Sequence, residues 1–371
     1  MRIALLTDLY PPYIGGQPIR FQELATRLAA RGHDVTVYCV RTHPSSPATA
    51  TEDGVRVVRG PLDERYDDPV VAATKRGVRS TARYALGVRR ALRSEGFDVA
   101  YFNQWPFLHV LLAPRAARRR AAIDWCELRS GPIYGAVQRV LPRLVAGNLC
   151  VNDLLASRLE AASGVAVGYL PSGVATERYW SAPRDERRGL LFLGRLVDTK
   201  DVPLLIAGYG EVWRRGFHRP LLVAGDGTLA PVLERALGDL PEGARRQVEV
   251  LGKVSDDEKV RLLATAEALV VSSKREGFPV VVAEAMASGL PVATVDRPDN
   301  GTAHVVARYG VGASGPPDPS GLADAIEAVL ARWDECSQRG RAAAPELHWD
   351  RIVDQWIVRA EVMAGGEDGE R

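Results

Sequence analysis

The amino-acid sequence predicts an α/β protein made of two doubly wound domains, each a parallel sheet covered by helices. The chain has 371 residues, and one domain usually holds about 150 residues. Short apolar runs bounded by turn residues alternate with segments of helical period, which is the pattern of parallel strands connected by helices. This order of elements begins again near Leu190, after a connection at about Pro171–Arg187.

The first half supplies the elements of one such domain. Ile3–Thr7 is an apolar run typical of a buried strand, and a turn at Pro11–Gln17 leads to a helix over Ile19–Arg31 that Gly32 ends. Further strands are expected at Asp34–Val40, Val55–Arg59, Val99–Phe102 and Arg118–Trp125, and Ala166–Leu170 closes this half. Further helices are expected at Val70–Glu95, Pro132–Ala146 and Leu154–Ala162.

The second half repeats this order of elements. Its expected strands are Leu190–Leu193, Pro220–Ala224, Val248–Leu251, Ala268–Ser272 and Pro291–Thr294. Its expected helices are Asp201–Arg215, Leu229–Leu237, Asp256–Thr265, Val280–Ser288, Ser320–Arg332 and Trp349–Met363. We therefore place one domain at residues 1–172 and a second at residues 173–345.

Composition and cysteine spacing exclude several classes of protein. With 46% hydrophobic and 25% charged residues, the chain has the composition of a globular protein. No stretch approaches the roughly 18 apolar residues of a spanning helix, and the apolar run at the N-terminus is too short for a signal peptide. The four cysteines, Cys39, Cys126, Cys150 and Cys336, have no C-x-x-C spacing, so we expect a cytoplasmic protein without structural zinc.

The two halves carry opposite net charge. Residues 1–170 hold 23 Lys and Arg against 15 Asp and Glu, a net charge of +8, whereas the rest of the chain has a net charge of −6. Arginines are frequent in Val70–Glu95 and Arg115–Arg120. They are consistent with a solvated face, with binding of a phosphorylated acceptor, or with peripheral contact to the inner face of an anionic membrane. Nucleic acid is not expected, because no recognition motif or stacking aromatic accompanies them.

The strongest candidate site is a pair of carboxylates eight residues apart, Glu276 and Glu284. Glu276 is expected at the end of a strand, where its carboxylate can accept hydrogen bonds from ligand hydroxyls, and Glu284 about two turns into the following helix. Backbone amides between Gly277 and Val280 are donors at a helix N-terminus, which suits an anion. On their own, two glutamates at this spacing could equally be surface charges.

Two loops add cations and glycines at the carboxyl ends of other strands. Arg195 and Lys200 follow the first strand of the second domain and can hold a diphosphate. Gly15 and Gly16 follow the first strand of the first domain, where glycines let backbone amides approach a phosphate closely. An ordinary turn with surface charges is the alternative for each loop.

These residues resemble the retaining glycosyltransferases of family 4, which have the GT-B architecture of two Rossmann-like domains facing a central cleft. The segments that carry the resemblance are Gly15–Gly16, Gly194–Lys200, Val223–Gly227, Leu251–Ser255, Glu276–Glu284 and Glu284–Val292. The resemblance is dense from about residue 188 to 300 and extends over nearly the whole chain. It implies that residues 346–371, with the helix at Trp349–Met363, cross back onto the first domain.

The resemblance also implies roles in binding a sugar nucleotide. Glu276 would hold the hydroxyls of the transferred sugar, Glu284 the ribose, and Arg195 with Lys200 the diphosphate. The other donor-binding residues that it implies are Gly15, Gly16, Lys253, Val254, Gly277, Phe278, Pro279 and Val280. Cleavage of a glycosyl–phosphate bond puts negative charge on the leaving diphosphate, and cations and amides placed there stabilise the transition state.

One segment departs from the family's pattern. Many members place a His after a strand of the first domain, and here Cys126 stands at that place in Ile123–Gly131. Either Asp124 or Glu127 can supply an acceptor base or position the acceptor hydroxyl. Cys126 is expected to be a packed cysteine rather than a nucleophile, because no His partner is visible. His109 is a second candidate for the missing His, with a structural role as the favoured alternative.

Three other functions compete with sugar transfer. Gly225–Ala230 fits the glycine pattern of a nicotinamide dehydrogenase, but it follows the second strand of its domain, whereas that fingerprint belongs to the first. A sugar-nucleotide 2-epimerase would use the same donor site without an acceptor. A non-catalytic sugar-nucleotide-binding protein would bind the donor without turnover.

The expected function is that of a retaining hexosyltransferase. It would move a hexose-type sugar from a nucleoside-diphosphate sugar to an acceptor hydroxyl bound on the first domain. The acceptor is left open between a lipid, a glycan intermediate and a secondary metabolite. No metal or cofactor is expected, because the sequence has no D-x-D motif and Arg195 with Lys200 supply the charge that a divalent ion would bring.

Overall fold

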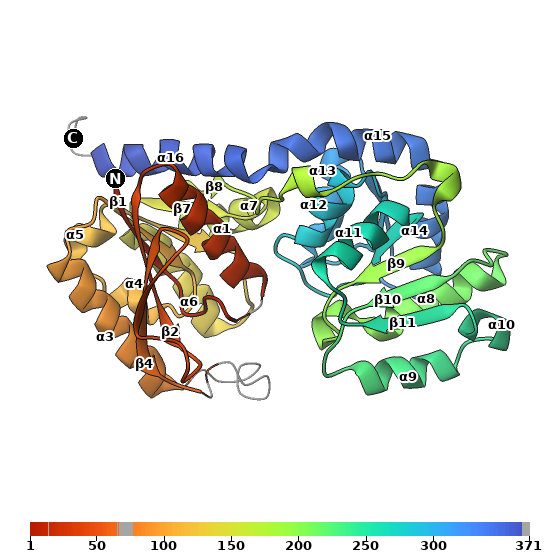
Figure 1. Ribbon diagram of the computed structural model, residues 1–371, viewed down its shortest axis with the longest axis horizontal. Helices are drawn as coiled ribbons and strands as arrows, with labels where there is room; N and C mark the ends of the chain where they lie inside the picture. The colour runs from red at the N-terminus through yellow and green to blue at the C-terminus, as the bar shows by residue number, and fades with distance from the viewer. Residues whose placement is uncertain (14, 65, 67–76, 366–371) are drawn as a thin grey trace. The chain divides into compact units, whose positions relative to one another are not determined.

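The computed structural model describes residues 1–13, 15–64, 66 and 77–365. The chain divides into two compact units, both visible in Figure 1. Unit 1 contains Met1–Ser172 and Trp349–Arg371, and unit 2 contains Gly173–His348. Each unit is a mainly parallel sheet with helices on its faces. The prediction of an α/β protein with two doubly wound sheets is confirmed.

Unit 1 is built on an eight-stranded sheet, as far as the described residues show, in the order β3-β4-β2-β1-β5-β6-β7-β8. β3 pairs antiparallel with β4, and the other neighbours are parallel. The strands are β1 (Arg2–Leu6), β2 (Asp34–Arg41), β3 (Thr49–Glu52), β4 (Val55–Leu62), β5 (Val99–Asn103), β6 (Ala121–Trp125), β7 (Gly147–Cys150) and β8 (Gly168–Tyr169). The helices are α1 (Gly16–Ala30), α3 (Val78–Ser94), α4 (Leu108–Leu112), α5 (Arg115–Arg118), α6 (Pro132–Val140), α7 (Asp153–Ser163) and α16 (Trp349–Gly365).

Several boundaries in unit 1 differ from the expected ones. The helix expected at Pro132–Ala146 ends at Val140, and a 3-10 turn follows over Leu141–Leu144, because Pro142 cannot donate the hydrogen bond that would continue an α-helix. The strand expected from Arg118 begins at Ala121, because Arg115–Arg118 forms a helical turn. Of the helix expected at Val70–Glu95, residues 70–76 lie outside the described residues.

The last helix of the chain, α16, packs in the core of unit 1. Its apolar residues recur at helical spacing and form one face, on which Trp349, Val353 and Trp356 are buried. The Trp356 ring meets Tyr101 of β5 edge-on, with ring centroids 5.6 Å apart. Hydrophobic burial therefore attaches the C-terminal segment to the sheet that begins at the N-terminus.

Unit 2 is built on a six-stranded parallel sheet, within the described part of the chain, in the order β11-β10-β9-β12-β13-β14. The strands are β9 (Leu190–Leu193), β10 (Leu221–Ala224), β11 (Val248–Gly252), β12 (Ala268–Val271), β13 (Val292–Val295) and β14 (Gly312–Gly315). The helices are α8 (Val202–Arg214), α9 (Ala230–Gly238), α10 (Glu242–Arg245), α11 (Asp256–Thr265), α12 (Val280–Ala287), α13 (Gly301–Tyr309), α14 (Pro319–Ala331) and α15 (Trp333–Ala343). One hydrophobic core lies under α8 and α14, and another contains residues of α11, α12 and α13.

Four elements of unit 2 were not expected from the sequence: β14, α10, α13 and α15. β14 is made of small residues without an apolar run, and its Gly312 lies so close to β13 that a Cβ would be 1.8 Å from the carbonyl oxygen of Val292. α15 is mostly polar, and its buried residues are Trp333, Cys336, Ser337 and Gly340. Hydrophobic periodicity does not detect elements of this kind, because tertiary packing determines them.

Candidate active site

Glu276 and Lys200 form an ion pair at the carboxyl edge of the unit 2 sheet. β9 and β12 are neighbours, so the loops that follow them meet. Lys200 Nζ donates to Glu276 Oε1, and the side chains are 18% and 17% exposed. The Ser273 hydroxyl donates to the same oxygen at 3.2 Å. Within the described residues no hydrogen bond reaches Oε2 of Glu276, so this oxygen is available to a ligand.

The backbone fixes the position of Glu276. Its amide donates to the carbonyl of Asp299 at 3.0 Å, and its own carbonyl accepts from the amide of Gly301 at 2.8 Å. These bonds attach the loop after β12 to the start of α13. On the other side, the Ser272 hydroxyl donates to the carbonyl of Lys200 at 2.7 Å. The two charged residues are therefore held by hydrogen bonds to their backbone as well as by the ion pair.

Glu284 is buried on α12 and is held by two residues that sequence reasoning missed. Its Oε1 accepts from the Tyr179 hydroxyl at 2.8 Å and from Lys259 Nζ at 2.9 Å. Burial would lower the pKa of Lys259, but the charge and hydrogen bond of Glu284 outweigh it, so the pKa is raised. Burial, followed by the Glu284 charge, raises the pKa of Tyr179. Oε2 of Glu284 makes no hydrogen bond to any described residue.

The loops after β9 and β10 pack backbone against backbone. Gly194 donates its amide to the carbonyl of Ala224 at 3.0 Å, and Leu196 donates to Asp226 at 2.9 Å. A Cβ on Gly225 would lie 1.8 Å from the carbonyl oxygen of Gly194. The close packing of these two loops explains the glycines in the dehydrogenase-like pattern at Gly225–Ala230. The packing requires glycine there whether or not a dinucleotide binds.

The remaining residues expected to bind the donor lie on neighbouring loops of unit 2. Arg195 and Lys253 are exposed, and neither forms an ion pair within the described residues. Val254 and Phe278 are partly buried and pack against the core beside α11 and α12. Gly277 and Pro279 precede α12, whose N-terminus has no side-chain cap. The amides of its first turn are therefore suited to an anion.

Gly15 and Gly16 lie in unit 1, at the start of α1. Gly15 is the N-cap and Gly16 the first helical residue, and no side chain caps this helix. A Cβ on Gly16 would meet nothing within 4 Å. Packing within the described residues does not require glycine at Gly16, in contrast to Gly225.

Asp124 is part of a buried network rather than an accessible base. It is 0% exposed. Arg20 donates to both of its oxygens, at 2.9 and 3.0 Å, and the Tyr101 hydroxyl donates to Oδ1 at 2.6 Å. Arg20 also donates to the carbonyls of Leu170 and Pro171. Of the two carboxylates left open by the sequence, Asp124 therefore links β6 to α1, and Arg20 of α1 is bonded in turn to the chain after β8.

Glu127 and Cys126 follow β6 and are positioned by Gln104. The Gln104 side-chain oxygen accepts from the amides of both residues, at 2.7 and 3.1 Å. Glu127 pairs with Arg129 at 2.6 Å, and the Arg129 guanidinium lies 4.4 Å from the ring centroid of Trp105. Burial raises the pKa of the Cys126 thiol well above its usual range. A protonated thiol is a poor nucleophile, so this supports a packing role.

His109 is also buried in unit 1. Its Nε2 lies 2.8 Å from the carbonyl oxygen of Asn103, and its ring contacts Tyr84 and Phe102. These contacts fit the structural role that the sequence favoured. Among residues 1–13, 15–64, 66 and 77–365, no group of three or more His, Cys, Asp or Glu side chains is arranged to hold a metal ion. None of the helices formed by those residues has the length and apolarity required to cross a bilayer.

Comparison with known proteins identifies the class. The chain aligns with the glycogen synthase of Mycobacterium tuberculosis at 28% identity, covering 100% of this chain and 96% of the relative. The sucrose-phosphate synthase of Thermosynechococcus elongatus superposes with a TM-score of 0.80 at 20% identity, covering 98% of this chain and 100% of the other. Anabaena HepE, solved in complex with UDP and glucose, superposes with a TM-score of 0.73 at 17% identity, covering 97% of this chain and 99% of HepE. The fold is therefore GT-B, the two-domain fold of glycosyltransferases.

Two family models place the chain within that class. Residues 15–165 match the glycosyl transferase 4-like domain, and residues 176–345 match the glycosyl transferases of group 1. The chain belongs to the family 4-like glycosyltransferases, enzymes that transfer sugars. The resemblance inferred from the motifs is confirmed.

Proposed function

We propose that this protein is a retaining hexosyltransferase that uses a nucleoside-diphosphate sugar and needs no metal ion. The observation that carries the proposal is the pair of carboxylates Glu276 and Glu284. Each has one oxygen bonded to a lysine and the other without a hydrogen bond in the described part of unit 2. Two fixed acceptors in unit 2 suit the hydroxyls of a sugar and of a ribose.

In this proposal, unit 2 binds the donor. Glu276 Oε2 accepts from hydroxyls of the transferred sugar, and Glu284 Oε2 accepts from the ribose. Lys200 and Arg195 bind the diphosphate together with amides of Gly277–Val280, while Lys253 and Val254 lie against the base. UDP bound to HepE, a protein of the same fold, is consistent with a nucleoside diphosphate as part of the donor.

The reaction breaks the bond between the sugar C1 and the diphosphate oxygen and forms a bond from C1 to the acceptor oxygen. Negative charge grows on the leaving diphosphate, where Lys200 and Arg195 stabilise it. The sugar gains oxocarbenium character, which the nearby carboxylate of Glu276 favours. On the same face, the departing phosphate oxygen takes the acceptor proton. No side-chain nucleophile is needed, in agreement with the raised pKa of the Cys126 thiol.

Unit 1 is proposed to bind the acceptor. Glu127 is the candidate for orienting the acceptor hydroxyl, because its carboxylate is paired with Arg129 and its backbone is fixed by Gln104. Lys200 and Arg195 supply positive charge in the donor site, so the proposal assigns no step to a divalent ion. We expect the transfer rate in excess EDTA to equal the rate in magnesium, and a rate that depends on added magnesium would contradict this.

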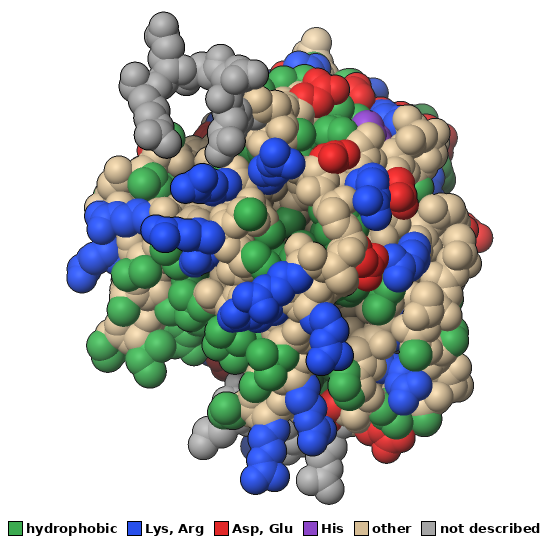
Figure 2. Space-filling model, turned by 90° about the vertical axis from the view of Figure 1, so that its left-hand side faces the viewer, with side chains coloured by type: hydrophobic (Ala, Val, Ile, Leu, Met, Phe, Trp, Pro, Cys, Tyr) green, Lys and Arg blue, Asp and Glu red, His purple; other side chains and the backbone are tan. Residues whose placement is uncertain are grey.

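Peripheral contact with an anionic membrane belongs to the same proposal. Figure 2 faces the side of unit 1 that carries α3 and α5, and it shows Lys and Arg side chains interspersed with hydrophobic ones. Arg79, Arg90 and Arg93 are exposed on α3, and Val78 and Leu86 are 82% and 56% exposed. Exposed cations beside apolar groups favour an acidic lipid surface. Cosedimentation with phosphatidylglycerol vesicles but not with phosphatidylcholine vesicles is the expected result.

A thermal-shift screen with UDP, GDP, ADP, dTDP and NADH, in EDTA, tests the donor assignment. A ligand at 100 times its Kd adds about 2.7 kcal/mol to the stability of the folded form, a shift of roughly 5–10 °C for a domain of this size. A shift with one nucleoside diphosphate supports the proposal. A shift with NADH alone would contradict it. In turnover assays, isomerisation of the donor sugar in the absence of an acceptor would indicate an epimerase. Binding of the donor without any turnover would indicate a non-catalytic protein.

A further inference from the structure

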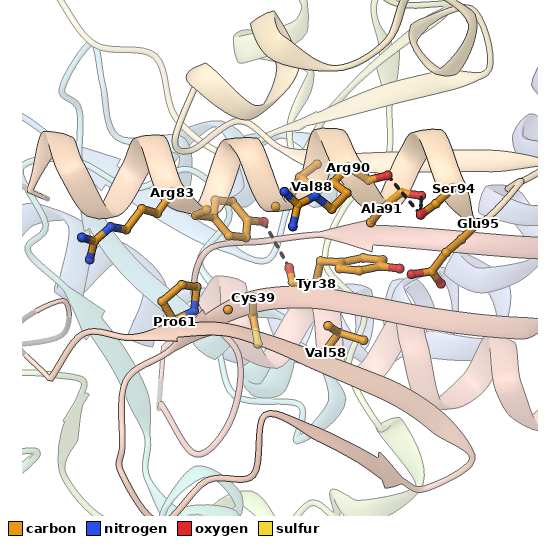
Figure 3. Close-up of a pocket in the computed structure, with 13 residues that line it drawn as sticks. Tyr38, Cys39, Val58, Pro61, Arg83, Val88, Arg90, Ala91, Ser94 and Glu95 are labelled. Atoms are coloured by element: carbon orange, nitrogen blue, oxygen red, sulfur yellow. Dashed lines mark hydrogen bonds between the residues drawn. The ribbon is translucent and has the colours of Figure 1, made fainter.

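A groove lies in unit 1 between α3 and strands β2 and β4, and none of the residues assigned to sugar transfer lines it. Figure 3 shows α3 above the two strands, with the lining side chains between them. The volume of the groove is about 210 Å³. This is room for about seven groups of the size of a water molecule or a methylene, at roughly 30 Å³ each. Its walls are mostly apolar and include the residues Tyr38, Val58, Pro61, Val88 and Ala91.

The groove stays open because α3 presents small residues to it. A Cβ on Gly87 would meet nothing within 4 Å, and Ala91 lies one turn further along the helix. The helix is fixed elsewhere, since Val88 is buried in the unit and the Tyr84 hydroxyl donates to the carbonyl of Tyr38 at 3.1 Å. The space is therefore a feature of how α3 packs on the sheet, and its walls are held in place.

The unpaired charges along this groove are positive. Arg83 and Arg90, seven residues apart on one side of α3, line it and are exposed. Neither guanidinium forms a hydrogen bond or ion pair with the described residues. Glu95, the carboxylate that lines the groove, is bonded to Arg56. The net charge that the groove offers to a ligand comes from the two arginines.

We propose that this groove binds the alkyl chain of an anionic lipid, with the anionic group of the lipid against Arg83 or Arg90. An alkyl chain fills an apolar space that water hydrates poorly, and a guanidinium forms strong hydrogen bonds with phosphate or carboxylate. The groove combines an apolar space of about 210 Å³ with unpaired cations beside it. An anionic lipid carries both the apolar chain and the negative group that match these two features. Neither feature depends on sugar transfer.

Octyl phosphate, below its micelle concentration, is the probe for this site. Titration calorimetry on the full chain is expected to show saturable binding of one molecule. Octyl glucoside, which is neutral, is expected to bind at least tenfold more weakly, and inorganic phosphate without the chain should not bind measurably. Binding of inorganic phosphate as tight as that of octyl phosphate would overturn the proposal.

Variants of α3 localise the binding. Gly87→Leu fills the groove and is expected to lower the affinity at least tenfold, whereas Gly87→Ala should lower it less. Arg83→Gln with Arg90→Gln leaves the core intact and should lower it at least fivefold, and Arg93→Gln, on the same helix but outside the groove, should not. No saturable binding by the wild type, equal affinity in the double arginine variant, or an equal loss in Arg93→Gln would overturn the proposal. Each readout is binding of the probe, so failure of the proposed sugar transfer would be recognised separately.

Discussion

Replacement of Glu276 by glutamine is expected to separate donor binding from sugar transfer. In the free protein the carboxylate of Glu276 holds Lys200, so a diphosphate must displace it to reach the lysine. Both side chains are less than one fifth exposed, at 17% and 18%, so solvent screens their interaction only in part. A charge-assisted hydrogen bond of this kind contributes about 1.5–3 kcal/mol net.

The sign of the binding change follows from this competition. Glu276→Gln removes the negative charge near the diphosphate and releases Lys200, so the affinity for the free nucleoside diphosphate should rise by about tenfold, or 1.4 kcal/mol. The transfer rate should fall by about 10²–10³-fold, because the stabilising carboxylate is lost from the transition state. Titration calorimetry gives the affinity, and release of nucleoside diphosphate from the sugar nucleotide gives the rate.

Two lysines provide the matched comparison. Lys200→Met should weaken nucleoside diphosphate binding at least tenfold. Lys274→Met should not change it, because Lys274 lies on the same loop as Glu276 but pairs with Asp198 at the surface. If Glu276→Gln weakens nucleoside diphosphate binding and leaves the transfer rate intact, the assignment of both Glu276 and Lys200 is refuted.

Three further changes test other parts of the structure. Arg20→Met should lower the free energy of unfolding by about 3–5 kcal/mol, because the buried carboxylate of Asp124 loses its cation. Urea denaturation followed by tryptophan fluorescence measures this loss. A loss below about 1 kcal/mol would contradict the stabilising role of the Arg20–Asp124 pair. Cys126→Ser should leave the transfer rate within about twofold of the wild-type rate. In the wild type, the Cys126 thiol should react with iodoacetamide only slowly at pH 8, because its pKa is raised. Complete loss of activity in Cys126→Ser would instead indicate that Cys126 is a nucleophile. Gly225→Ala should destabilise unit 2 by at least about 2 kcal/mol, since its Cβ would lie 1.8 Å from the carbonyl oxygen of Gly194; an unchanged melting temperature would show that the loops can separate.

Much of the fold was predictable because most strands and helices produce a local pattern of apolar and turn residues in the sequence. β1 and β9 are apolar runs between turn residues, and α16 repeats apolar residues at helical spacing. The prediction was wrong where an element depends on its surroundings. β14 contains two glycines, an alanine and a serine, and it is a strand because it pairs with β13 at the edge of the sheet.

The candidate site was likewise predictable only where its residues are marked by local features of the sequence. Glu276 and Glu284 were identified from their spacing around a strand end and a helix start, which are local features. Tyr179 and Lys259 were missed, because they bond to Glu284 from 105 and 25 residues away along the chain. Lys259 follows the Ser255 cap of α11 by four residues, a weak signal in hindsight, and nothing near Tyr179 marks it.

The sequence by itself determined the class of fold, the order of its elements and the segments that carry the charged groups of the candidate site. Those are consequences of local hydrophobic periodicity and of turn chemistry. Only the tertiary structure decided that Asp124 is enclosed by Arg20 and Tyr101, that Gly225 is required by the carbonyl of Gly194, and that α3 leaves a groove over β2 and β4. Burial and close approach are set by residues distant in the chain, and a single sequence does not record which of them meet.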